Sequence, residues 1–227
     1  MGISPEANLI TTLTNNLNFT LDKVDICSCS WGPAEWEDQE GDYFENSFTG
    51  SLIENGIDTG RNGKGIIYCF ANGNERLSKD NSNFDAIIRH RYTIACASLE
   101  INDKDNRLIS QAWYSDYGCC ILVCGYGSEG GVDDGVFTVN TSNSHNSNIS
   151  FGYNFSSYIK NFNGSSSATP MIAGIVGCIL EANPNLNWRE VQHILVNSCI
   201  KVGVPQTGPV YYDYDGENDL QEYVTNG

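Results

Sequence analysis

The chain has 227 residues, of which 40% are hydrophobic and 18% charged, a composition that supports one sizeable buried core and excludes a disordered chain. Its 28 acidic and 12 basic residues give a formal net charge of −16. Such a field repels nucleic acids and anionic lipids and attracts cationic peptides or metal ions, so we expect no nucleic-acid partner.

Short apolar runs predict the strands of the fold. They cover residues 24–30, 65–71, 92–98 and 121–125. Each run is apolar almost without interruption, which is typical of strands in a parallel sheet that is covered on both faces. Between the first two runs, apolar residues recur close to helical spacing at Phe44, Phe48, Leu52 and Ile53. A strand, a helix and a second strand in this order predict an α/β class with a mostly parallel central sheet.

The most apolar stretch of the chain follows three consecutive serines, at residues 165–167. Residues 168–182 are apolar nearly all round and end before Pro184, which predicts a helix buried at the centre of the domain. The uninterrupted apolar part is about half of the ~20 residues that a spanning helix needs, so we expect no membrane span. Asn187 and Glu190 have the spacing of a capping box, which predicts a second helix.

Two later segments have weaker patterns. Residues 140–163 are rich in asparagine and serine and show little periodicity, which predicts a surface loop. The acidic segment after Gly208 has only a weak strand signal.

The nine cysteines show no paired C-x-x-C spacing, so the sequence gives no indication of a zinc site. Most lie in apolar runs and are expected to be small buried hydrophobes. Cys119, Cys120 and Cys124 are better placed than the others to form disulfide bonds. Asn-x-Ser/Thr sequons begin at Asn18, Asn140, Asn148, Asn154 and Asn163. They suit a secretory-pathway glycoprotein, although chance could produce them in so asparagine-rich a chain, and the chain shows no signal peptide.

Three segments carry candidate chemistry: DICSCSWGP at residues 25–33, CFANGNE at 69–75 and NGSSSATPMIAG at 163–174. The last fits the nucleophile pattern G-T-S-x-A-x-P, the second fits a strand-ending A-x-G-N, and the first fits S-x-S-W-G-P. In these motifs the chain resembles the subtilisin-like serine proteases. It is most similar to the kexin and furin branch, which cleaves proproteins after basic residues. The resemblance implies a subtilisin-like three-layer fold.

The resemblance assigns roles to four residues of these segments. It implies that Ser166 is the nucleophile, that the Asn74 side chain donates to the oxyanion, and that Trp31 and Gly32 contact substrate. The physical setting of Ser166 agrees, because the start of a buried helix presents free N–H groups that stabilise developing negative charge.

Helix capping is an equally good explanation of Ser166 taken alone, since a serine oxygen can accept from the first turn of a helix. The matching Asn74 and Ser-Trp-Gly-Pro segments favour the nucleophile. We expect the neighbouring Ser165 and Ser167 to cap and pack the helix.

Four carboxylates match positions of the same family. They are Glu35 after W-G-P, Asp80 six residues after Asn74, Asp85 five residues further on, and Asp116 in WYSD. The resemblance implies that Asp80, Asp116 and Glu35 bind Ca²⁺, and that Asp85 and Glu35 face a basic substrate side chain. Glu37 or Asp38 could replace Glu35, and a solvated surface charge is the alternative for each carboxylate.

No histidine of this sequence matches the general base of such a protease. The family orders its triad as Asp, His and Ser, and none of His90, His145 and His193 lies in an H-G-T pattern. The resemblance implies that the chain starts downstream of the Asp and His segments. Residues 1–227 are then one partial catalytic domain without its N-terminal part.

Without a base, a serine hydroxyl is a poor nucleophile near neutral pH. We therefore expect a serine endopeptidase domain that is inactive alone, with basic peptide or proprotein substrates and a place in the secretory pathway or outside the cell. Two rival hypotheses are a pseudoprotease that binds basic peptides and a calcium-stabilised secreted glycoprotein.

Overall fold

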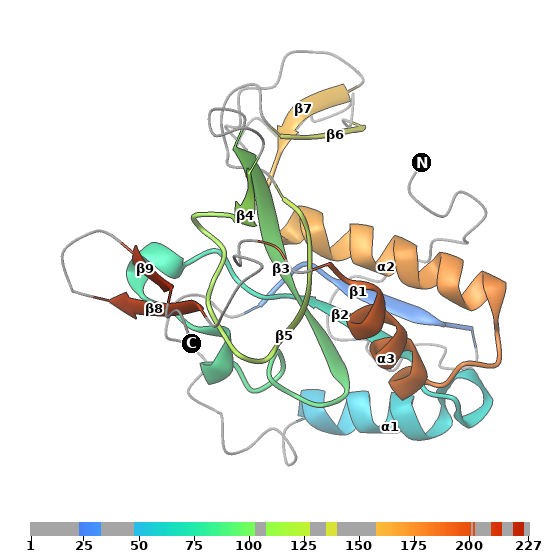
Figure 1. The fold of residues 1–227 in the computed structure, drawn as a ribbon. Helices are drawn as coiled ribbons and strands as arrows, with labels where there is room; N and C mark the ends of the chain where they lie inside the picture. Colours follow the sequence, from blue (N-terminus) through green and yellow to red (C-terminus); the bar gives the residue numbers. More distant parts are fainter. Residues whose placement is uncertain are drawn as a thin grey trace, which may run out of the picture.

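A mostly parallel sheet lies at the centre of the computed structural model (Figure 1). The structure describes residues 23–32, 48–102, 108–127, 135–139, 158–200, 202, 210–214 and 220–224. The sheet strands are β1 (Ile26–Cys29), β2 (Ile67–Ala71), β3 (Thr93–Asn102), β4 (Leu108–Gln111) and β5 (Ile121–Tyr126). β1 pairs with β2, β2 with β3 and β3 with β5, all in parallel, and β4 runs antiparallel to β3. The predicted strands and their parallel arrangement are confirmed.

Helices and two small hairpins complete the described part of the chain. They are α1 (Phe48–Gly63), η2 (Arg76–Ser78), η3 (Ser82–Phe84), β6 (Val136–Val139), β7 (Tyr158–Phe162), α2 (Ser165–Ala182), α3 (Trp188–Ser198), β8 (Val210–Tyr214) and β9 (Leu220–Val224). The loop predicted over residues 140–163 is wrong at β7, which pairs antiparallel with β6. Residues 140–157 lie outside the described part. The weak strand signal after Gly208 corresponds to the β8–β9 hairpin.

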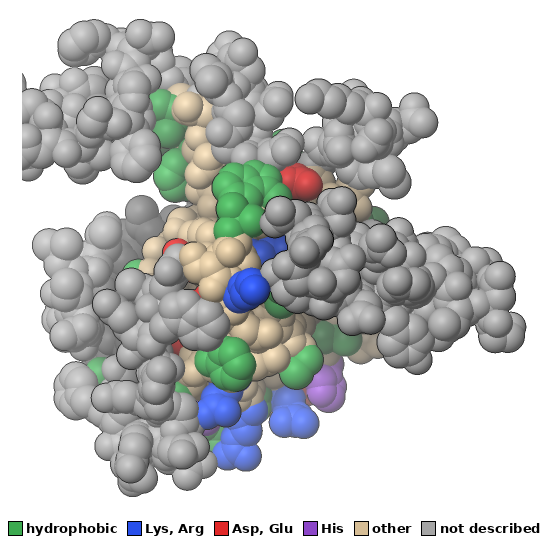
Figure 2. All heavy atoms as spheres, turned by 90° about the vertical axis from the view of Figure 1, so that its left-hand side faces the viewer, with side chains coloured by type: hydrophobic (Ala, Val, Ile, Leu, Met, Phe, Trp, Pro, Cys, Tyr) green, Lys and Arg blue, Asp and Glu red, His purple; other side chains and the backbone are tan. Residues whose placement is uncertain are grey.

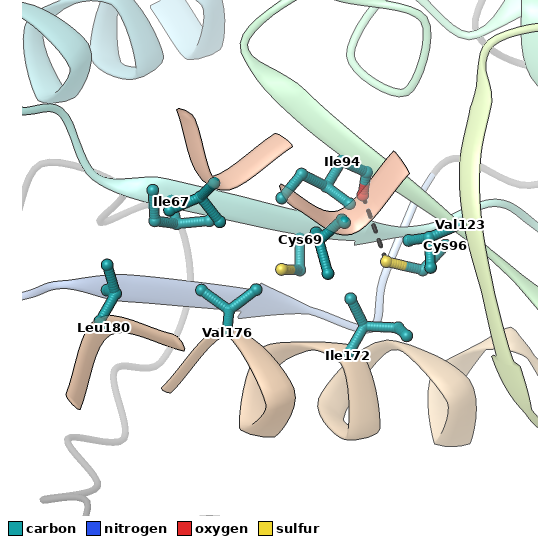
Figure 3. Packing of buried hydrophobic residues seen from close by; sticks show 10 residues of the cluster. Ile67, Cys69, Ile94, Cys96, Val123, Ile172, Val176 and Leu180 are labelled. Carbon is teal, nitrogen blue, oxygen red and sulfur yellow. Dashed lines mark hydrogen bonds between the residues drawn. The ribbon is translucent and has the colours of Figure 1, made fainter. Parts of the chain in front are cut away.

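Alternate residues of β2 face two different helical layers. Ile67 and Cys69 belong to a buried cluster with residues of α2 and α3, and Figure 3 shows the α2 side chains directed at this face of the sheet. Tyr68 and Phe70 belong to a second cluster, with Ile53 and other α1 residues. The sheet therefore has helices on both faces, and the expected three-layer α/β fold is confirmed.

α2 is long and apolar enough to cross a membrane by length and composition alone. In the structure it packs against β1, β2, β3 and β5. Its residues Ile172, Val176 and Leu180 enter the core (Figure 3). We therefore assign α2 to the protein core, as predicted, with a start three residues earlier than the apolar pattern indicates.

All nine cysteines lie in described residues, and each is a free thiol. The bonding expected of Cys119, Cys120 and Cys124 is therefore absent from this structure. Burial raises the pKa of the Cys27 thiol to about 12 and those of Cys120 and Cys124 to about 11. These thiols are protonated at neutral pH, so they act as packing groups rather than as nucleophiles.

Arg61 joins three segments at the amino-terminal end of the sheet. The residue has a left-handed backbone (φ 52°) near the end of α1, and its side chain is only 4% exposed. Its Nε donates to Asp25 Oδ1 at 3.1 Å, just before β1. One guanidinium nitrogen donates to the carbonyls of Gly65 and Leu186, each at 3.1 Å. Arg61 thereby ties α1 to the starts of β1 and β2 and to the α2–α3 connection.

Removal of this side chain is expected to destabilise the fold. Arg61→Ala should lower the free energy of unfolding by about 2–4 kcal/mol, because buried carbonyls lose charged donors. The free energy of unfolding of Arg61→Lys should lie between those of the parent and Arg61→Ala, since an ammonium cannot form the same planar fork of hydrogen bonds. Urea denaturation measures both, with the exposed Lys23→Ala as control. Equal stability of Arg61→Ala and Lys23→Ala would contradict this role.

Candidate active site

The candidate site forms where the carboxyl ends of β1 and β2 meet the start of α2. Parallel strands place their carboxyl ends at one edge of a sheet, where α/β proteins commonly bind ligands. Ser30 directly follows β1, and its Oγ donates to the carbonyl of Ser166 at 2.9 Å. In return, Ser166 Oγ lies 3.5 Å from the carbonyl oxygen of Ser30. The Ser-Trp-Gly-Pro and serine motifs of the sequence are therefore in direct contact.

Asn74 follows β2 and caps the start of α2. Its Oδ1 accepts from the backbone N–H of Ser165 at 2.8 Å and from Ser165 Oγ at 3.0 Å. The N-cap position itself is Gly164, which has no side chain to perform this function. The prediction that the serines cap the helix is therefore wrong, because the capping oxygen comes from Asn74. With Oδ1 held by two donors, Asn74 Nδ2 is the amide group that can donate to a ligand.

Tyr114 anchors the same helix start from a third segment. Its hydroxyl donates to the carbonyl of Gly127 at 2.7 Å and accepts from the N–H of Gly164 at 3.0 Å. Burial raises the pKa of Tyr114, which keeps the hydroxyl protonated as this pattern requires. Ser167 Oγ donates to the carbonyl of Gly164 at 2.8 Å, in the packing role expected of it. Sequence reasoning missed Tyr114, although it belongs to the WYSD motif.

Buried Asn72 holds the turn that carries Asn74. Its side chain is surrounded by partners and the residue is 1% exposed. Its Nδ2 donates to the carbonyl of Asp116 at 2.7 Å, and its Oδ1 accepts from Ser115 Oγ at 3.1 Å. Its carbonyl accepts from Ser82 Oγ at 2.9 Å. The end of β2 is therefore bound to the segment around Ser82 and to the segment of Ser115 and Asp116, which lies more than 40 residues away in sequence.

Asp116 and Glu75 fix the backbone on the two sides of Asn74. Asp116 Oδ1 accepts from the N–H of Glu75 at 2.7 Å, and Glu75 Oε2 accepts from the N–H of Asn74 at 2.6 Å. Asp116 Oδ2 lies so close to Gly73 that an added Cβ would be 1.9 Å away. Gly73 also has a φ of +105°, so this turn requires glycine for two separate reasons.

The other predicted carboxylates bind nearby backbone. Asp80 Oδ1 accepts from the N–H of Asn81 at 2.7 Å. Asp85 is 9% exposed, and its Oδ1 accepts from Ile87 and Ile88 at 2.7 and 2.9 Å. Asp85 thereby caps the turn that leads to β3.

The described residues include only part of the set predicted to bind calcium. Among them, no group of three His, Cys, Asp or Glu side chains is placed to hold a metal ion. Asp80 and Asp116 are described, whereas Glu35 and its alternatives Glu37 and Asp38 lie outside the described residues. The calcium role of these carboxylates remains a prediction.

Trp31 and Gly32 lie beside the helix start, as their chain position next to Ser30 requires. The Trp31 ring is 49% exposed and packs edge-on against Phe70, with 5.5 Å between centroids. Among the described residues, a side chain at Gly32 would meet no atom within 4 Å. Trp31 therefore presents an exposed ring one residue after Ser30, and the contact of Trp31 and Gly32 with substrate remains a prediction.

The histidines of the described part lie elsewhere. His90 packs on Tyr92, 4.9 Å between centroids, where the chain enters β3. This is the amino-terminal end of the parallel sheet, opposite the end that carries Asn74. His193 is exposed on α3, and His145 lies outside the described residues.

Comparison with known proteins gives the family. Residues 4–223 match the model of the Subtilase family, Peptidase S8. The chain belongs to the subtilase family. Among curated proteins, a calcium-dependent protease of Trichormus variabilis is 34% identical over 209 residues, which are 86% of this chain and 29% of that protein. Kexin of Saccharomyces cerevisiae is 31% identical over 189 residues, which are 82% of this chain and 20% of that protein.

A solved serine protease structure agrees at the level of the fold. The serine protease of Aeromonas sobria aligns with a TM-score of 0.55 and 18% identity, over 88% of this chain and 38% of that chain. The chain spans less than a third of the length of the curated relatives named above.

Two substitutions of Asn74 separate its acceptor from its donor. Asn74→Ala should lower the free energy of unfolding by about 1 kcal/mol, because α2 loses its capping oxygen. Asn74→Asp keeps an acceptor and should retain most of that stability. Urea denaturation in high salt, which screens repulsion from Glu75 and Asp116, measures both. The capping role is refuted if the aspartate variant is as unstable as the alanine variant.

Proposed function

We propose that this subtilase chain carries the nucleophile and oxyanion part of a serine endopeptidase site, with Ser166 as nucleophile and Asn74 as oxyanion donor. The supporting observation is the bond from Ser165 N–H to Asn74 Oδ1, 2.8 Å long, which holds the Asn74 amide against the residue next to Ser166. The Ser166 side chain is partly exposed, so a substrate can reach it.

The reaction is acyl transfer. Ser166 Oγ attacks the carbonyl carbon of a peptide, and negative charge develops on the carbonyl oxygen. The C–N bond then breaks, the amine leaves with the proton that the base took from Ser166, and water later releases the acyl group as a carboxylate. The Asn74 Nδ2 group and the N–H of Ser166 stabilise that charge, because the N–H groups of Ser165 and Ser167 already have acceptors. The Ser166 proton must pass to a base, and the described histidines lie at the other end of the sheet or on α3. We therefore propose that the base comes from outside the described residues and that the 227-residue chain alone reacts slowly.

The proposed substrates are peptides with basic residues. The net charge of −16 attracts cations, and Asp85 is the carboxylate proposed to face the basic side chain. The names of two relatives, Kexin and a dibasic-processing endoprotease, support this choice. By the same reasoning we propose Ca²⁺ as a stabilising ion, which the name of the Trichormus relative supports, and a secretory-pathway location.

A fluorophosphonate probe tests the nucleophile. We expect slow labelling that mass spectrometry locates on Ser166 and that Ser166→Ala abolishes. Ser165→Ala is the matched control, because it removes the adjacent hydroxyl and keeps the N–H that binds Asn74. It should retain labelling. Label on another residue, or equal labelling of Ser166→Ala, would refute the assignment.

A second candidate function is the binding of basic peptides without hydrolysis. The position of His90 and His193 away from Ser166 favours it. In that case the probe does not react, whereas an Arg-Arg peptide binds and Asp85→Asn weakens binding by about tenfold, the usual order for loss of one charged partner. The asparagine side chain would keep the oxygen that caps the turn, so unchanged thermal stability is the control. Binding that Asp85→Asn leaves intact would exclude Asp85 from the peptide site.

A further inference from the structure

The amino-terminal end of the sheet carries a basic and aromatic surface that the proposed protease site does not use. Its residues come from the entry to β3, at Arg91 and Tyr92, and from the first turn of α3, at Trp188 and Arg189. Figure 2 shows Lys, Arg and His side chains gathered at the lower end of the described surface. We call the four named residues the cation–aromatic stack.

The members of the cation–aromatic stack contact one another in series. The Arg91 guanidinium lies 4.7 Å from the centroid of the Tyr92 ring. The Tyr92 ring meets the Trp188 ring edge-on, with centroids 5.0 Å apart. The Arg189 guanidinium lies 5.8 Å from the centroid of Trp188. Two exposed cations therefore flank two half-buried rings.

Backbone contacts hold the stack in place. Trp188 N–H donates to the carbonyl of Lys64 at 2.8 Å, and the Trp188 ring packs so closely on Gly65 that an added Cβ there would lie 2.7 Å from it. Gln192 Nε2 donates to the carbonyl of Arg91 at 3.1 Å, which joins α3 to the entry of β3. The surface is therefore built by tertiary structure, so its two segments present their charges together.

Arg91 Nη2 donates to the Tyr92 hydroxyl at 2.6 Å, and its other guanidinium donors, with those of Arg189, are available for an anionic partner. Within the part of the chain that the structure describes, neither Arg91 nor Arg189 forms an ion pair. The adjacent Glu190 is engaged in the capping box of α3, where its Oε2 accepts from the N–H of Asn187 at 2.8 Å. Asp25, at the same end of the sheet, pairs with Arg61. These two acidic side chains thus have partners of their own.

We propose that the cation–aromatic stack binds a short acidic peptide segment, with its carboxylates on Arg91 and Arg189 and its backbone or an apolar side chain against the Tyr92 and Trp188 rings. Guanidinium groups suit carboxylates because they donate in pairs, and stacking on aromatic rings orients them. This surface is separate from the Ser166 site and does not rest on the function proposed for it.

The net charge of the chain favours a short acidic peptide over a long polyanion as the ligand of the cation–aromatic stack. A nucleic acid or an anionic membrane extends beyond the stack and meets the field of a molecule with a charge of −16. At physiological salt, screening limits the range of interactions between exposed charges to about 8 Å. A segment of a few residues bound to the stack therefore interacts mainly with the two arginines. A short acidic segment is therefore the occupant that the charge distribution favours.

Fluorescence anisotropy with a fluorescein-labelled tetrapeptide of alternating Asp and Glu, short enough to stay on the cation–aromatic stack, tests the proposal. The full chain should bind it, and the double variant Arg91→Ala/Arg189→Ala should bind about tenfold or more weakly, because two charged contacts are lost. Binding should weaken as salt increases. Lys79→Ala removes one positive charge just beyond Asn74, at the other end of the sheet, and should bind as the parent does.

Several outcomes would overturn the proposal. They are absence of binding, equal binding by the double variant, and tighter binding of a single-stranded oligonucleotide of equal charge. Both arginines are exposed, and a thermal melt of the double variant shows whether the fold is intact. If it is not, Arg91→Gln/Arg189→Gln, which keeps the stems that cover the rings, replaces it. Ser166→Ala should bind the peptide normally, so failure here is distinct from failure of the protease assignment.

Discussion

The buried amide of Asn72 is the constraint on which the candidate site depends. A polar side chain at the end of a central strand is costly to bury unless each of its groups has a partner, and both groups of this amide do. Those partners, Asp116 and Ser115, belong to the loop that also supplies Tyr114. One satisfied network therefore sets the turn after β2 and, through the Tyr114 hydroxyl, the start of α2.

This arrangement joins the two halves of the site through neutral hydrogen bonds. Gly164 leaves the first turn of α2 without a side-chain cap, and Asn74 supplies the missing acceptor across a sequence separation of 91 residues. The same amide then has one group bound to the helix and one group that can donate to a ligand. One side chain thus both caps α2 and supplies a donor beside Ser166. The turn that carries this side chain is fixed on both sides by Glu75 and Asp116.

The parts of the fold that could be predicted are those with a local or periodic cause. β2 is apolar along its whole length because Ile67 and Tyr68 face different helical layers, and the capping box of α3 lies within four consecutive residues. β7 could not be predicted, because its pairing with β6 leaves no periodic pattern. For the site, the motifs indicated Ser166 and Asn74 through resemblance. The roles of Tyr114 and Ser30 depend on contacts between distant segments, which a single sequence does not display.

The net charge of −16 belongs to the chain as a whole, because cations and anions lie at both ends of the strands. Lys79 follows the turn that carries Glu75, and Asp25 lies at the same end of the sheet as Arg91. The excess of carboxylates therefore raises the rate at which cationic molecules meet the protein from any direction. Added salt would slow that encounter without altering a single bond within the protein.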